Sequence, residues 1–144
     1  MHRDDTLEAF CAAFNKLDKS CTNLLYELYT HDVIFIDPFH HIAGLEALEA
    51  HFLGLYENVT ECRFSFHERA IQGQKAYVTW TMHLTHPRLA GGKPLKVEGC
   101  SQLRFSDRTP ERVCVHRDYF DAGAMLYEQL PLLGPLVRWI KHRV

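Results

Sequence analysis

The sequence contains no apolar run approaching the roughly 20 residues of a membrane-spanning helix, and basic residues are not in excess. The net charge is −2, whereas a nucleic-acid-binding protein needs a basic face. The charged N-terminal stretch MHRDDTLEAF includes no apolar segment of the kind that signal peptides carry. We therefore expect a soluble, cytoplasmic protein that binds no nucleic acid.

Motifs for thiol, serine and phosphate chemistry are also missing. The five cysteines are scattered and form no C-x-x-C motif, which argues against a disulfide framework and a thiolate zinc site. No G-x-S-x-G turn presents a nucleophilic serine. Gly91 and Gly92 precede Lys93 outside any strand–loop–helix context, so they predict a turn and not a phosphate-binding loop. The histidines match no zinc-binding pattern either, and we expect neither a metal nor another cofactor.

A chain of 144 residues, 47% hydrophobic and 24% charged, is long enough to bury a core as one domain over 1–144. Apolar residues recur at helical spacing over 6–17, 21–30 and 45–57. A β-branched and aromatic strand, 33–37, is ended by Pro38. Alternation predicts four further strands in an antiparallel meander, and two short helices follow. These segments are 62–71, 76–85, 95–105 and 112–121 for the strands, then 122–130 and about 135–143 for the helices. The fold class is therefore α+β with a curved sheet, and its core spans about 5–130.

The stretch FIDPFHHIAG, residues 35–44, places an acid, a proline and two adjacent histidines at the end of an apolar run. Asp37 could act as a catalytic base, could bind a metal together with His40 and His41, or could simply begin a turn. Aspartate before proline is common at a strand-to-turn boundary, where its side chain bonds nearby backbone groups. No spacing suggests a third metal ligand, so we expect the two histidines to be loop residues at the mouth of a pocket.

Strand alternation places a second carboxylate in apolar surroundings. Trp80 and Met82 share one face of their strand, and His116, Asp118 and Phe120 share one face of the last strand. Desolvation raises carboxyl pKa values, which suits proton transfer near neutral pH. The alternatives are that the polar groups are structural and that Trp80 and Met82 belong to the core.

The layout resembles the nuclear-transport-factor-2-like superfamily, and within it the bacterial SnoaL-like branch. The resemblance rests on the D-P and G of FIDPFHHIAG, the W-x-M at Trp80 and the R-D-Y-F-D that begins at Arg117. It covers nearly all of residues 5–130. It implies a cone of strongly curved antiparallel sheet (a cystatin-like α+β barrel) with N-terminal helices that cover a pocket. It also implies a homodimer formed through the outer face of the sheet.

Residue by residue, the resemblance carries over only in part. Asp37 aligns with the proton-shuttling base of ketosteroid isomerases, but Phe10 and Ser101 stand where those enzymes have their oxyanion-stabilising groups. Asp118 aligns with the first aspartate of the R-D-Y-F-D strand of limonene-epoxide hydrolases. Trp80 and Met82 occupy the places of the other catalytic residues. The resemblance thus implies the pocket more strongly than either chemistry.

Our leading hypothesis is a protein that binds a small apolar ligand, lipid-, polyketide- or terpenoid-like, in an internal pocket. The alternatives are a cofactor-independent isomerase, cyclase or hydratase with Asp37 or Asp118 as general base, and a non-catalytic protein-interaction module. The candidate ligand-binding residues are Phe10, Phe14, His40, Phe52, Trp80, Met82, His116 and Phe120. We expect the C-terminal amphipathic helix to pack on its own domain or on a second copy, in preference to lying on an anionic membrane.

Overall fold

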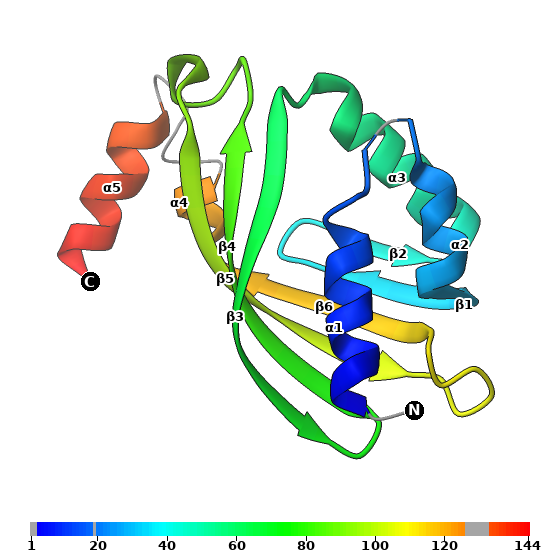
Figure 1. The fold of residues 1–144 in the computed structure, drawn as a ribbon. Helices are drawn as coiled ribbons and strands as arrows, with labels where there is room; N and C mark the ends of the chain where they lie inside the picture. The colour runs from blue at the N-terminus through cyan, green and yellow to red at the C-terminus, as the bar shows by residue number, and fades with distance from the viewer. Residues whose placement is uncertain (1–2, 19, 126–132) are drawn as a thin grey trace.

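The computed structural model describes residues 3–18, 20–125 and 133–144, and it places a curved sheet beside a group of helices (Figure 1). The helices are α1 (Arg3–Phe14), α2 (Leu25–Leu28), α3 (Leu45–Asn58), α4 (Ala122–Met125) and α5 (Leu133–Arg143), with 3-10 turns η1 (Thr22–Leu24) and η2 (Ala90–Gly92). The strands are β1 (Tyr29–Ile36), β2 (His41–Ala43), β3 (Glu61–Gln72), β4 (Lys75–Thr85), β5 (Leu95–Phe105) and β6 (Val113–Phe120). The predicted α+β class is confirmed.

The six strands form one sheet in the order β2-β1-β6-β5-β4-β3. Strands β3 to β6 make the predicted antiparallel meander, whereas β1 pairs with β6 in parallel. The sheet is curved but unclosed, with β2 and β3 as its edges. A register shift in β3 between Phe66 and Arg69 marks a bulge, and bulges bend a strand and increase its twist.

The region before Asp37 differs from the prediction. The helix expected over 21–30 is reduced to η1 and α2, and β1 begins at Tyr29. Tyr29 pairs with Val113 of β6, so pairing between distant segments overrides the apolar spacing that suggested a helix. Strand β2 was not predicted, because three residues carry no recognisable period. The predicted helix over 122–130 is observed as α4, and its remainder lies outside the described residues.

The core lies between the concave face of the sheet and helices α1 and α3 (Figure 1). Leu7 and Phe10 of α1 and Leu48 of α3 are at most 5% exposed. Burying such side chains stabilises a fold by about 1.5–3 kcal/mol each. The helices therefore shield the aromatic residues of the concave face from solvent. The candidate site lies on this concave face.

Helix α5 has exposed apolar side chains, and its packing on its own domain or on a second copy stays a prediction. Leu136, Trp139 and Ile140 are 51%, 58% and 48% exposed. An ion pair links the helix to the end of β6, with Lys141 Nζ 2.6 Å from an Asp121 carboxylate oxygen. No helix in the described part of the chain has the length and apolar character needed to cross a membrane.

Candidate functional site

An apolar pocket of about 90 Å³ lies between the concave sheet face, helix α3 and the turn that joins β1 to β2. Aromatic side chains dominate its wall, and its polar side chains include Asp37, Asp118, His40 and His51. A smaller void of about 10 Å³ adjoins it, because Phe14, Phe64, Trp80 and Asp118 line both spaces. The pocket thus combines an apolar wall with a few polar groups, as ligand sites commonly do.

Eight of the ten residues selected from the sequence line the larger pocket: Asp37, Asp118, Phe14, His40, Phe52, Trp80, Met82 and Phe120. The other two, Phe10 and His116, line the adjoining void. Alternation explains much of this placement. Trp80 and Met82 of β4 are 2% and 8% exposed, while their neighbours in sequence are less buried. The structure therefore brings Asp37 and Asp118 to one space, although they lie 81 positions apart in the sequence.

A chain of buried and partly buried hydrogen bonds holds Asp118 in place. Trp80 Nε1 donates to Ser101 Oγ at 2.8 Å, and Ser101 Oγ donates to Asp118 Oδ1 at 2.5 Å. His116 Nε2 lies 2.7 Å from the same Oδ1, and His116 Nδ1 lies 2.7 Å from the Tyr29 hydroxyl. Four of these side chains come from neighbouring strands β4, β5 and β6, and Tyr29 comes from β1.

The surroundings of Tyr29 keep its hydroxyl protonated. Burial, with the nearby Asp118 charge as the next cause, raises the pKa of Tyr29 well above its usual value, so its hydroxyl stays protonated. In the tautomer of His116 that carries its proton on Nε2, Tyr29 donates to Nδ1 and Nε2–H donates to Asp118. Both bonds to Asp118 end on Oδ1, and no described residue donates to Oδ2. Asp118 therefore presents one carboxylate oxygen that a bound molecule could use.

Sequence reasoning did not find this chain of bonds. Tyr29 was assigned to a helix, and Ser101 was noted only as a departure from the isomerase pattern. Ser101 lies directly opposite Asp118 in the β5–β6 pairing. The contact follows from the register of the β5–β6 pairing, and the sequence alone does not specify this register.

Asp37 has a local structural role as well as a place in the pocket wall. Its Oδ1 accepts hydrogen bonds from the backbone N–H groups of Phe39 and His40, each at 2.8 Å. His40 Nδ1 lies 3.1 Å from the same oxygen. Asp37 thus begins the turn after β1, the simplest of the three alternatives that the sequence left open.

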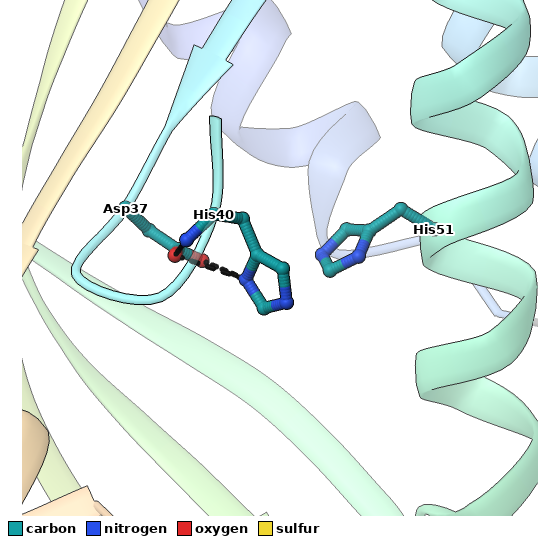
Figure 2. Close-up of side chains that lie close together, drawn as sticks. All are labelled: Asp37, His40 and His51. Carbon is teal, nitrogen blue, oxygen red and sulfur yellow. Dashed lines mark hydrogen bonds and ion pairs between the residues drawn. The ribbon is translucent and has the colours of Figure 1, made fainter. Parts of the chain in front are cut away.

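His51 of α3 faces the same turn (Figure 2). Its ring centroid lies 4.5 Å from that of His40. Burial, followed by repulsion from His40, lowers the pKa of His51, and attraction to Asp37 opposes this only in part. His51 is therefore largely neutral near pH 7. Sequence reasoning missed His51, because helical spacing gave it only a place on the apolar stripe of α3.

Cys62, the cysteine in the pocket wall, has a thiol of low reactivity. Burial raises the pKa of Cys62 to about 11, so only about one thiol in ten thousand is ionised at pH 7. A thiolate is the reactive form of cysteine. The pocket therefore offers carboxylates and imidazoles for chemistry, and Cys62 is not a ready nucleophile.

Comparison with known families identifies the fold. Residues 7–110 match the model of the SnoaL-like domain, which is most of the chain. The chain belongs to the SnoaL-like family. The predicted membership of the nuclear-transport-factor-2-like superfamily is thereby confirmed.

Solved structures of this type share the fold at low sequence identity. An NTF2-like protein of unknown function from Burkholderia pseudomallei has a TM-score of 0.73 and 18% identity, over 88% of this chain and 96% of that one. A protein from Catenulispora acidiphila with a ketosteroid isomerase-like fold, in complex with trimethylamine, has a TM-score of 0.72 and 16% identity, over 88% and 93%. An LEH-like epoxide hydrolase from M. tuberculosis has a TM-score of 0.67 and 19% identity, over 95% and 94%. No curated protein sequence matches the chain. At these identities the likeness concerns the fold alone.

Proposed function

We propose that this SnoaL-like protein binds a small apolar molecule bearing one hydroxyl group, and that Asp118 is the main polar contact. The observation that carries the proposal is the orientation of Asp118. Its Oδ1 is held by Ser101 and His116, while Oδ2 has no described donor at the pocket wall. A partly buried acceptor held in this way selects a ligand that carries a donor at the matching place.

Binding requires the pocket to widen. Its volume of about 90 Å³ is well below the roughly 300–1,000 Å³ of sites for drug-sized ligands. His40 and Leu55 are exposed although they also line the pocket, so they mark its mouth. We propose that the β1–β2 turn and α3 separate there to admit the ligand.

The proposal can be tested with cyclohexanol, a compact apolar alcohol that does not absorb where tryptophan does. The chain has two tryptophans, so Trp139→Phe leaves Trp80 of the pocket wall as the only one. In this variant we expect cyclohexanol to change Trp80 fluorescence saturably, because the ligand contacts the indole. Adding Met82→Phe should fill the pocket and abolish the change, whereas Met82→Leu, which conserves volume, should retain it. An unsaturable change, or an equal one with Met82→Phe, would contradict the proposal.

A second candidate function is proton transfer, with Asp118 as the general base of an isomerase, cyclase or hydratase. The specific observation is the pair of hydrogen bonds that orients its carboxylate next to an apolar space. A base held in this way can remove a proton next to a carbonyl group without a cofactor. We favour Asp118 over Asp37, because His40 Nδ1 contacts both carboxylate oxygens of Asp37, whereas no described residue donates to Asp118 Oδ2.

We also propose a homodimer through the outer face of the sheet. Tyr77 and Tyr119 are 36% and 49% exposed on that side, and the strand pairing places Cys100 and Gln102 of β5 between β4 and β6. Helix α5, which lies on the opposite side of the sheet from α1 and α3 (Figure 1), adds exposed apolar surface. Aromatic residues of this kind are enriched at protein interfaces.

Sedimentation velocity tests the dimer. We expect the wild-type chain to sediment as a dimer and Tyr119→Asp as a monomer, because a buried unpaired charge opposes association. Leu53→Asp is the control, since Leu53 is 41% exposed on α3, away from the sheet, and it should remain dimeric. A monomeric wild type would reject the proposal, as would loss of the dimer on Leu53→Asp alone.

A further inference from the structure

We propose that Asp37, His40 and His51 form a binding site for a divalent transition-metal ion, such as Zn²⁺, at the mouth of the pocket (Figure 2). One carboxylate oxygen and one ring nitrogen from each histidine lie within 4.8 Å of one another. Two imidazoles and one carboxylate are a donor set that suits Zn²⁺ and its neighbours in the first transition row. The inference does not depend on the proposed ligand.

The spacing of Asp37 and His40 already fits a shared ion. His40 Nδ1 lies 3.1 Å from Asp37 Oδ1 and 3.4 Å from Oδ2. Two ligand atoms at about 2.1 Å from one ion, at angles between octahedral and tetrahedral, lie roughly 3.0–3.4 Å apart. Since Oδ1 already accepts two backbone N–H groups, Oδ2 is the oxygen left for the ion.

The two imidazole rings fit the same geometry. Their centroids are 4.5 Å apart, and the angle between the ring planes is 58°. Rings whose nitrogens share one ion at about 2.1 Å have centroids roughly 4.5–5.2 Å apart. The donor atoms lie within 4.8 Å of one another, so ion binding requires the His51 side chain to bring its nitrogen closer to the other two.

The electrostatics and the position are also suitable. No lysine or arginine is among the described residues that line the pocket around Asp37, His40 and His51. A cation at this place therefore meets a carboxylate and two imidazoles without a competing positive charge. All three residues line the pocket. A four-coordinate ion bound by these three side chains would have one position left for water or a ligand from the pocket, as in catalytic zinc sites.

The expectation of no metal site arose from sequence spacing. In the sequence His40 is adjacent to His41, and the side chains of adjacent residues diverge. The spacing of the other residues suggested no third ligand. The third ligand comes from α3, ten positions beyond His41. Only the packing of α3 against the β1–β2 turn places it there.

Zinc binding to the tag-free, chelator-treated full-length chain tests the inference, by equilibrium dialysis with elemental analysis. We expect one Zn²⁺ per chain in the wild type, and a melting temperature that rises when Zn²⁺ is added. His51→Ala and, separately, His40→Ala should lose both the bound zinc and the rise. His41→Ala is the matched control and should keep both, because His41 is exposed and outside the cluster.

Cobalt provides a second readout, since Co²⁺ bound by nitrogen and oxygen ligands absorbs in the visible range without the charge-transfer band of a thiolate. A wild-type chain that binds no zinc would overturn the inference. So would zinc that persists at the same stoichiometry in both His40→Ala and His51→Ala, or a thiolate band that points to the cysteines. Circular dichroism of each variant shows whether it is folded. If one of the two histidine variants does not fold, the other still tests the inference.

Discussion

Gly99→Ala is expected to destabilise the protein by roughly 3 kcal/mol, at the upper end of overpacking effects. Gly99 of β5 lies opposite Trp80 of β4. A Cβ atom there would lie 2.3 Å from Trp80 Cη2 and 2.7 Å from the Tyr119 carbonyl oxygen. The indole cannot move away freely, because it is 2% exposed and bonded to Ser101. Urea unfolding measures the effect as a lower midpoint at an unchanged slope.

Gly54→Ala is the matched control for that experiment. Gly54 lies in helix α3, and a Cβ there would meet nothing within 4 Å. Alanine is a better helix former than glycine by about 1 kcal/mol, so this variant should be slightly more stable than the wild type. Equal stability of Gly99→Ala and the wild type would show that the wall around Trp80 is not tightly packed.

Asp118→Asn is expected to weaken cyclohexanol binding roughly 10- to 100-fold. A hydrogen bond to a charged group contributes about 1.5–3 kcal/mol, and each 1.4 kcal/mol is about tenfold in affinity. Asparagine can still accept from Ser101 and His116, the two donors that hold Asp118 Oδ1. The substitution replaces Oδ2 by an amide NH₂ group, which removes the acceptor for the ligand hydroxyl. The bonds to Ser101 and His116 remain, so the fold should be kept. The fluorescence titration in the Trp139→Phe background measures the change.

The same variant distinguishes binding from proton transfer. If Asp118 is a general base, the wild type should speed the exchange of α-protons of cyclohexanone for deuterium in D₂O, and Asp118→Asn should abolish this. Asp37→Asn is the control, because asparagine also supports turns and Asp37 already bonds the turn backbone. Exchange that is lost in Asp37→Asn and kept in Asp118→Asn would assign the base to Asp37 instead.

Strand alternation and helical spacing, together with the family resemblance, predicted most of the fold. The inward face of β4, with Trp80 and Met82, follows directly from a period of two, since every second residue is buried there. The parallel pairing of β1 with β6 did not follow, because it depends on a contact between segments about 80 residues apart. Short elements such as β2 were missed, since a period needs more residues than a three-residue strand provides.

The site was predictable as a set of apolar residues with two carboxylates, but its polar connections were not. Ser101 contacts Asp118 through the β5–β6 register, and His51 meets His40 through helix packing. Neither contact can be predicted from the spacing of these residues in the sequence. Tyr29 illustrates the same point, because its bond to His116 spans 87 positions.

NMR of the wild-type chain with cyclohexanol tests the central claim most directly, through nuclear Overhauser effects between ligand and protein protons. The account predicts contacts from the cyclohexanol ring to Phe14, Phe52 and Trp80, all of which line the pocket with Asp118. These contacts should persist but require more ligand in Asp118→Asn. Contacts only to outer-face residues such as Tyr77, or none at high ligand concentration, would contradict the account and favour a protein-interaction role.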